Sequence, residues 1–167
     1  MFYRLLKKIF FIVLGLSISL FCHADSAQLH KKIAFKASVI LTDGWLRATA
    51  EGQEVGAAYI SLTSRKSSTL VTVKTDVADR VEMHSMSMDN GVMKMRHIET
   101  LDLPENKTVR LAPGGFHLML FDLKKPLKAG DHATFKLIFK AQNGRKFTQT
   151  LIMPILADAP TKIDGAN

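Results

Sequence analysis

The chain has 167 residues, a length typical of one domain, and its formal net charge is +8. Its single cysteine, Cys22, lies near the start. The residues that follow it can therefore form neither a disulfide framework nor a cysteine zinc site, and they offer no thiol nucleophile and no iron–sulfur ligands. The length is sufficient for one ordinary hydrophobic core.

Residues 1–24 are typical of a secretory signal peptide. Three basic residues open the segment, and an apolar run of 14 residues, Ile9–Cys22, follows them. That run is too short for a comfortable membrane span. Small residues suit cleavage after Ala24, and cleavage would remove the three basic residues but no acidic one. The mature chain then carries a net charge of +5.

Export predicts a protein of the bacterial periplasm, with no nucleic-acid partner and no stable membrane insertion once the signal is cleaved. The alternative is a lipoprotein anchored at Cys22, which is disfavoured because Phe21 is large where a small residue is needed. In an oxidising compartment thiols do not persist as soft-metal ligands. In such a compartment methionine and histidine can bind soft metal ions in place of cysteine.

The rest of the chain divides into a flexible arm (25–37), one β-domain (38–156) and a disordered tail (157–167). Within the domain, short runs rich in Val, Ile, Thr and Leu alternate with turn residues, among them Asp43-Gly44 and Asn143-Gly144. This pattern predicts an all-β sandwich or barrel. The expected strands are 38–48, 55–63, 69–76, 80–88, 92–98, 107–112, 116–123, 132–140 and 146–155.

Alternation in one strand is clear enough to assign its faces. Between 132 and 140 the apolar residues expected in the core are Ala133, Phe135, Leu137 and Phe139. Lys136 lies on the opposite, polar face of the same strand. Two aromatic residues, Trp45 and Tyr59, are expected to be packing residues as well.

Methionines are concentrated in one segment, RVEMHSMSMDNGVMKMRHI. Asn90-Gly91 in its middle is a strong signal for a two-residue hairpin turn. Such a turn pairs Met88 with Met93, Met86 with Met95 and His84 with His97. All six side chains then lie on one face of the hairpin, because strand residues alternate between faces. A register slip of one residue would destroy this arrangement.

His117 and Met119 share a face of another predicted strand. If that strand approaches the hairpin, imidazoles and thioethers converge. Thioether sulfur is soft and carries no proton near neutral pH, so the set favours Cu(I) over Zn, Mg or Ca. For any single methionine, core packing or a promiscuous protein-binding surface is the simpler interpretation. The clustering of five methionines in 13 residues favours a soft-metal site.

The spacing of these residues resembles the periplasmic copper chaperones called PCu(A)C. Their signature is a His, ten residues, a Met, 21 residues and then His-x-Met, which this chain meets at His84, Met95, His117 and Met119. The neighbouring segments GAAYISL, ADRVEMH, PGGFHLML and LKKPLKAGD are also similar to the family. The resemblance extends from about Val39 to Pro154.

The resemblance implies a cupredoxin-like, immunoglobulin-like Greek-key β-sandwich that binds Cu(I) through these four residues. It further implies a monomeric, non-enzymatic carrier that delivers copper to the dinuclear copper centre of cytochrome c oxidase. His97 stands where the family usually has proline, and it could be an extra ligand, an outer partner or a solvent-facing residue. The auxiliary methionines, Met86, Met88 and Met93, could guide or shield copper.

Other functions stay open at this stage. The same ligands would serve a periplasmic copper-sequestering or resistance protein with no dedicated acceptor. A methionine-rich docking module would bind protein and no metal, whereas a blue-copper protein would need a cysteine thiolate. The basic residues Lys124, Lys125 and Lys128 could contact an acidic partner. The acidic residues Asp76, Asp79 and Glu82 are expected to be turn and surface charges.

Overall fold

The short apolar runs fold into ten β-strands. The computed structural model describes residues 38–89 and 91–160, and all regular elements in those two stretches are strands. These residues include no helix that is long and apolar enough to cross a membrane. The strands are β1 (Val39–Arg47), β2 (Val55–Ser64), β3 (Ser68–Thr75), β4 (Ala78–Asp89), β5 (Val92–Ile98), β6 (Leu101–Leu103), β7 (Thr108–Leu111), β8 (His117–Leu123), β9 (His132–Ala141) and β10 (Lys146–Leu156).

Nine of the ten strands lie where the sequence predicts them, with ends that differ by at most two residues. The tenth, β6, was missed because three residues are too few to show an alternating pattern. The Asp43-Gly44 pair was wrongly interpreted as a turn signal. It forms a bulge inside β1, where Asp43 has a φ of 55° and the register with β2 shifts between Thr42 and Trp45.

The strands are hydrogen-bonded in the order β5-β4-β8-β2-β1-β10-β9-β3-β6, and β7 pairs with β2. Only β1 and β10 pair in parallel, while the other paired strands of the described residues are antiparallel. Buried residues from both halves of this sheet, such as Leu62 of β2 and Phe139 of β9, belong to one hydrophobic core. The predicted all-β sandwich is confirmed.

The core follows the alternation that the sequence predicts. The four apolar residues of β9 expected inside are each at most 1% exposed: Ala133, Phe135, Leu137 and Phe139. Trp45 of β1 lies opposite Tyr59 of β2, with their ring centroids 4.6 Å apart. Both rings are buried, which confirms them as packing residues.

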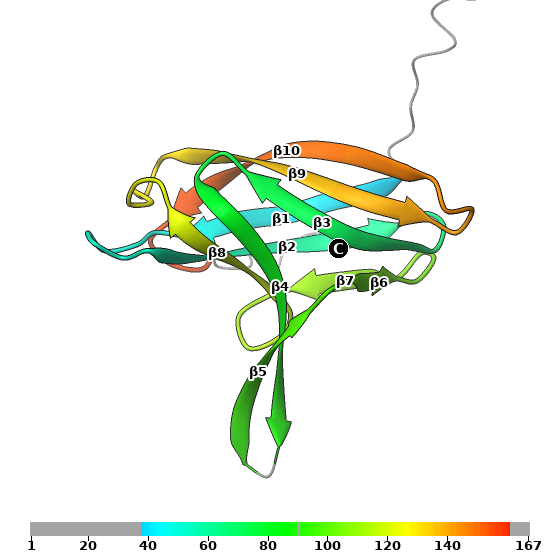
Figure 1. Cartoon of the computed structure of the whole chain (residues 1–167), viewed down its shortest axis with the longest axis horizontal. Helices are drawn as coiled ribbons and strands as arrows, with labels where there is room; N and C mark the ends of the chain where they lie inside the picture. Colours follow the sequence, from blue (N-terminus) through cyan, green and yellow to red (C-terminus); the bar gives the residue numbers. More distant parts are fainter. Residues whose placement is uncertain (1–37, 90, 161–167) are drawn as a thin grey trace, which may run out of the picture. The chain divides into compact units, whose positions relative to one another are not determined.

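One hairpin extends beyond the sandwich. Figure 1 shows the β4–β5 pair projecting away from the other strands, with β8 beside the base of β4. The first half of β4 is paired with β8 and its second half with β5, and the two pairings overlap at Met83 and His84. The base of the hairpin is therefore fixed on both sides, while its outer part is paired on one side only.

The alternation in β9 makes a direct prediction about stability. Phe135→Ala leaves a cavity in the core and should lower the free energy of unfolding by about 3–5 kcal/mol. Lys136, the next residue of β9, is on the exposed face, so Lys136→Ala should change the free energy of unfolding by less than about 0.5 kcal/mol. Chemical denaturation of both variants measures the difference. Similar small effects at the two positions would contradict the assigned faces.

Candidate metal centre

The hairpin has the register that its sequence predicts. Met88 pairs with Met93, Met86 with Met95, and His84 with His97. Gly91, in the turn, has a φ of 78°, a left-handed conformation that glycine adopts without strain. The imidazoles and thioethers of these three pairs therefore share one face of the β4–β5 ribbon.

Strand β8 brings the second predicted histidine to the same face. His117 pairs directly with His84, so His97, His84 and His117 form a row across three adjacent strands. The ring centroids are 5.7 Å apart for His97 and His84, and 5.8 Å apart for His84 and His117. His84 and His117 are buried, whereas His97 lies exposed on the edge strand β5.

His117 presents a nitrogen lone pair to a methionine sulfur. Its Nδ1 lies 3.0 Å from the carbonyl oxygen of Gly115, which can only accept a hydrogen bond, so Nδ1 carries the proton of the neutral ring. Its Nε2 then has a lone pair, and the Sδ of Met95 lies 3.3 Å from it. Two lone-pair atoms this close are stabilised by a cation or a proton between them.

His84 is oriented by a carboxylate. Its Nε2 lies 2.8 Å from Oε2 of Glu82, and it donates a hydrogen bond to that oxygen when the carboxylate is ionised. Its Nδ1 then has the lone pair, and this buried atom has no hydrogen-bond partner among the described residues. An unpaired buried nitrogen costs about 1–3 kcal/mol. A metal ion bound at Nδ1 would remove that cost.

Glu82 is itself held by a short network on the same face. Arg80 donates a hydrogen bond to Oε1 of Glu82, and its guanidinium lies 4.3 Å from the ring centroid of Phe121. The hydrogen bond from His84 has the largest effect and lowers the pKa of Glu82. Burial raises this pKa by less, and the charge of Arg80 contributes a further, smaller lowering. Glu82 is therefore ionised at neutral pH, and its carboxylate accepts a hydrogen bond from Nε2 of His84.

This network corrects the sequence interpretation of Glu82 as a surface charge. A histidine that binds a metal commonly donates its other N–H to a carboxylate, which fixes its tautomer. The signal that could have found Glu82 is its position two residues before His84, because residues i and i+2 of a strand share a face.

The fourth residue of the predicted ligand set lies slightly apart. Met119 follows His117 on the same face of β8 and pairs with Glu82 on one side and Ala57 on the other. Met119 also lines a depression beside β2, together with Arg47, Ala48, Thr49, Gln53, Val55, Gly56 and Ala57. The structure thus brings His84, His117 and Met95 together, with Met119 two residues from His117 on β8.

The donor set restricts what this face can bind. Within residues 38–89 and 91–160, no group of three or more His, Cys, Asp or Glu side chains is arranged to hold a metal ion. The donors that the structure does bring together at this face are the imidazoles of His84 and His117 and the thioether of Met95. Thioether sulfur favours soft ions such as Cu(I).

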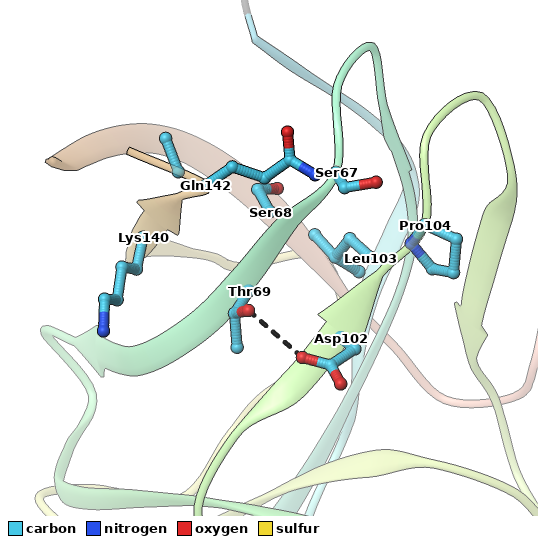
Figure 2. A pocket seen from close by; sticks show the side chains of 9 residues that line it. Ser67, Ser68, Thr69, Asp102, Leu103, Pro104, Lys140 and Gln142 are labelled. Atoms are coloured by element: carbon cyan, nitrogen blue, oxygen red, sulfur yellow. Dashed lines mark hydrogen bonds between the residues drawn. The ribbon is translucent and has the colours of Figure 1, made fainter. Parts of the chain in front are cut away.

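A second depression lies on other strands. Figure 2 shows it between β3, β6 and the end of β9, lined by Ser67, Ser68, Thr69, Asp102, Leu103, Pro104, Lys140, Ala141 and Gln142. Thr69 donates a hydrogen bond to Asp102 there, over 3.1 Å. Its lining contains no histidine and no methionine, so it does not belong to the candidate metal centre.

Comparison with known proteins identifies the family. The model of the family described as "Putative lipoprotein LpqE-like" matches residues 39–151. The chain belongs to the LpqE-like family. A relative from Leifsonia xyli subsp. xyli, "Putative lipoprotein Lxx21020", is 30% identical over 129 residues, which are 77% of this chain and 76% of the relative. The family description indicates an exported protein, secreted or associated with the cell envelope.

Solved structures with the same fold include a copper-bound PCuAC domain. The copper-bound PCuAC domain from PmoF2 has a TM-score of 0.57 and is 24% identical, covering 72% of this chain and 94% of that domain. The solution structure of apo-DR1885 from Deinococcus radiodurans has a TM-score of 0.51 and is 28% identical, covering 71% of this chain and 79% of that one. This LpqE-like chain therefore has the PCuAC fold, which confirms the resemblance seen in its sequence.

The two histidines should be found in opposite tautomers. In the metal-free protein we expect His84 to be protonated at Nε2 and His117 at Nδ1, because these atoms donate to Glu82 and Gly115. Nitrogen NMR of the labelled imidazoles, at a pH where both rings are neutral, distinguishes the two forms. Glu82→Ala should change the His84 signals and leave those of His117 in place. The same tautomer at both rings would contradict the assignment.

Proposed function

We propose that this LpqE-like protein is a periplasmic Cu(I) carrier that delivers copper to an acceptor, the copper-site subunit of cytochrome c oxidase. The observation that carries the proposal is the 3.3 Å contact between Nε2 of His117 and Sδ of Met95, beside the unpaired buried Nδ1 of His84. The ring centroids of His84 and His117 are 5.8 Å apart, so the two imidazoles and the thioether of Met95 lie close enough together to bind a single ion.

The ligands in this proposal are His84, Met95, His117 and Met119. Met119 shares a face of β8 with His117, and its three rotatable side-chain bonds allow its sulfur to approach the imidazoles without a change in the backbone. Thioether sulfur and neutral imidazole suit Cu(I), whose filled d shell imposes no fixed geometry. Neither methionine has to lose a proton on binding, so capture and release need no proton transfer at sulfur.

Exposure favours a carrier over an enzyme. Met95 is 51% exposed, so ligands of another protein can reach the ion while the buried imidazoles still hold it. A blue-copper electron carrier would need a cysteine thiolate, and the single cysteine of the chain is Cys22. Stepwise exchange of ligands with an acceptor is the chemistry that an open, partly thioether site supports.

The family description supports the proposed location. The LpqE-like description supports export, and the cleaved signal of residues 1–24 and a lipid anchor at Cys22 are the two forms that export can take. Residue Cys22 and the flexible arm predicted for 25–37 lie outside the described residues, as does the end of the predicted tail, 161–167. Either form leaves the β-domain in the same compartment as the copper subunit of the oxidase.

A basic surface is available for an acidic acceptor, although it does not adjoin the metal face. Lys124, Lys125 and Lys128 are exposed and follow the end of β8, whereas His117 begins that strand. At about 3.3 Å per residue, Lys124 lies roughly 23 Å along the chain from His117. These lysines can assist long-range attraction of an acidic partner, but they are too distant to contact the same ligands.

Copper binding is the first test. We expect the protein to bind one tight equivalent of Cu(I), measured anaerobically against a competing chelator. His84→Ala combined with His117→Ala should remove this equivalent, because losing the ligands costs more than the about 10–100-fold in affinity typical of losing an outer partner. His132→Ala, at an exposed histidine of β9, is the matched control and should bind like the wild type. Failure of the wild type to compete with the chelator would refute the carrier function.

Delivery is a separate test. A strain that lacks the protein should lose cytochrome c oxidase activity at low copper and regain it when copper is added. Expression of the His132→Ala protein should restore activity, and expression of the protein without His84 and His117 should not. Normal oxidase activity in the deletion strain, with greater sensitivity to excess copper, would instead indicate sequestration.

A further inference from the structure

Three methionines of the hairpin are outside both the core and the four-residue ligand set. Met86, Met88 and Met93 lie on the face that carries Met95. The four methionines form two facing pairs, Met88 with Met93 and Met86 with Met95. Met88 is 65% exposed and Met93 is 49% exposed. Figure 1 shows this part of the β4–β5 pair projecting away from the other strands.

Packing does not account for these side chains. Burying a methionine side chain contributes about 1.5–3 kcal/mol, and exposed methionines forgo most of it. Methionines that do fill the core are found elsewhere in the same chain: Met83, on the opposite face of β4, is 6% exposed, and Met153 is 1% exposed. Among the residues that the structure describes, the exposed methionines are Met88, Met93 and Met95, and all three lie on one face of the hairpin. Met86 lies beside them on the same face and is half-buried.

The geometry of an antiparallel pair brings these sulfurs within reach of one another. Directly opposite residues have Cβ atoms about 4.5–5.5 Å apart, and diagonal neighbours are about 7–8 Å apart. Met88 and Met93 are directly opposite, and Met86 is the diagonal neighbour of Met93. Three rotatable bonds in each side chain allow three sulfurs to converge on one soft ion.

The two faces of the ribbon differ in chemistry. The opposite face carries Lys94 and Arg96, and Lys94 forms an ion pair with Asp89 over 2.6 Å. In this part of the ribbon the methionines therefore lie on one face and the charged side chains on the other. Along the methionine face, Met88 and Met93 are followed by Met86 and Met95, and Met95 contacts His117. A Cu(I) ion held by thioethers alone would have a continuous series of identical neutral ligands between the end of the hairpin and the imidazoles.

We infer that Met86, Met88 and Met93 form a second, weaker Cu(I) site, which passes its ion to the inner site through Met95. This inference rests on the proposed copper-carrier function. Each transfer step forms one Cu–S bond at Met95 as one Cu–S bond at Met93 or Met86 breaks. The copper stays in the Cu(I) state and no proton moves, because the thioethers carry none.

The test compares Cu(I) stoichiometry in the full chain and in matched variants. The wild type should bind a second, weaker equivalent, and X-ray absorption should show a higher mean sulfur coordination when it is loaded. Met88→Leu combined with Met93→Leu should lose this second equivalent and keep the first, because leucine preserves the apolar volume and removes the sulfur. Met83→Leu removes a buried methionine of the same strand and should keep both equivalents.

The outcomes separate this site from the carrier function. His84→Ala with His117→Ala should keep the weaker equivalent and lose the tight one. A wild type that binds a single equivalent, lost with the two histidines, overturns the second site and leaves the carrier function intact. A second equivalent that persists in the Met88→Leu, Met93→Leu protein also overturns it. No binding of Cu(I) at all refutes both proposals, and the methionine face is then a protein-docking surface.

Discussion

The candidate metal centre depends on the register of one strand, β4, with neighbours on both sides. Pairing with β5 places His97 beside His84, and pairing with β8 places His117 on its other side. Because strand residues alternate between faces, a slip of one residue in either pairing would turn the histidines or the methionines to the opposite side. The core resists such a slip, since Met83 and Leu118, which pair directly behind the histidine row, are both buried.

Much of this arrangement could be predicted from local sequence. The Asn90-Gly91 turn is sufficient to set the hairpin register, and alternation is sufficient to collect the six imidazole and thioether side chains on one face. The approach of β8 could not be derived in this way, because the pairing of His84 with His117 joins residues more than thirty positions apart. Only the resemblance to the copper-chaperone signature indicated it.

Two features of the site could not be predicted from the sequence, for physical reasons. Glu82 is a typical surface residue by composition, and its role depends on a hydrogen bond to His84 and on Arg80 held against Phe121. Arg80 and Phe121 come together through the pairing of β4 with β8, which no local pattern of the chain encodes. Met119 shares a face of β8 with His117 as predicted, but the depression that it lines beside β2 also involves β1 and the segment after it, which no local pattern of the sequence brings together.

The proposed ligands differ in how deeply they are buried. The imidazoles of His84 and His117 are buried, and hydrogen bonds to Glu82 and Gly115 fix which nitrogen each ring presents. A fixed and desolvated ligand holds an ion well but exchanges it slowly, because the ligand cannot move to meet an incoming group. The thioether of Met95 is exposed, flexible and neutral, so it can detach and reattach without moving a proton. The proposed carrier function needs both behaviours in one site. The pairing of β4 allows for both, because its base is paired on two sides and its outer half on one.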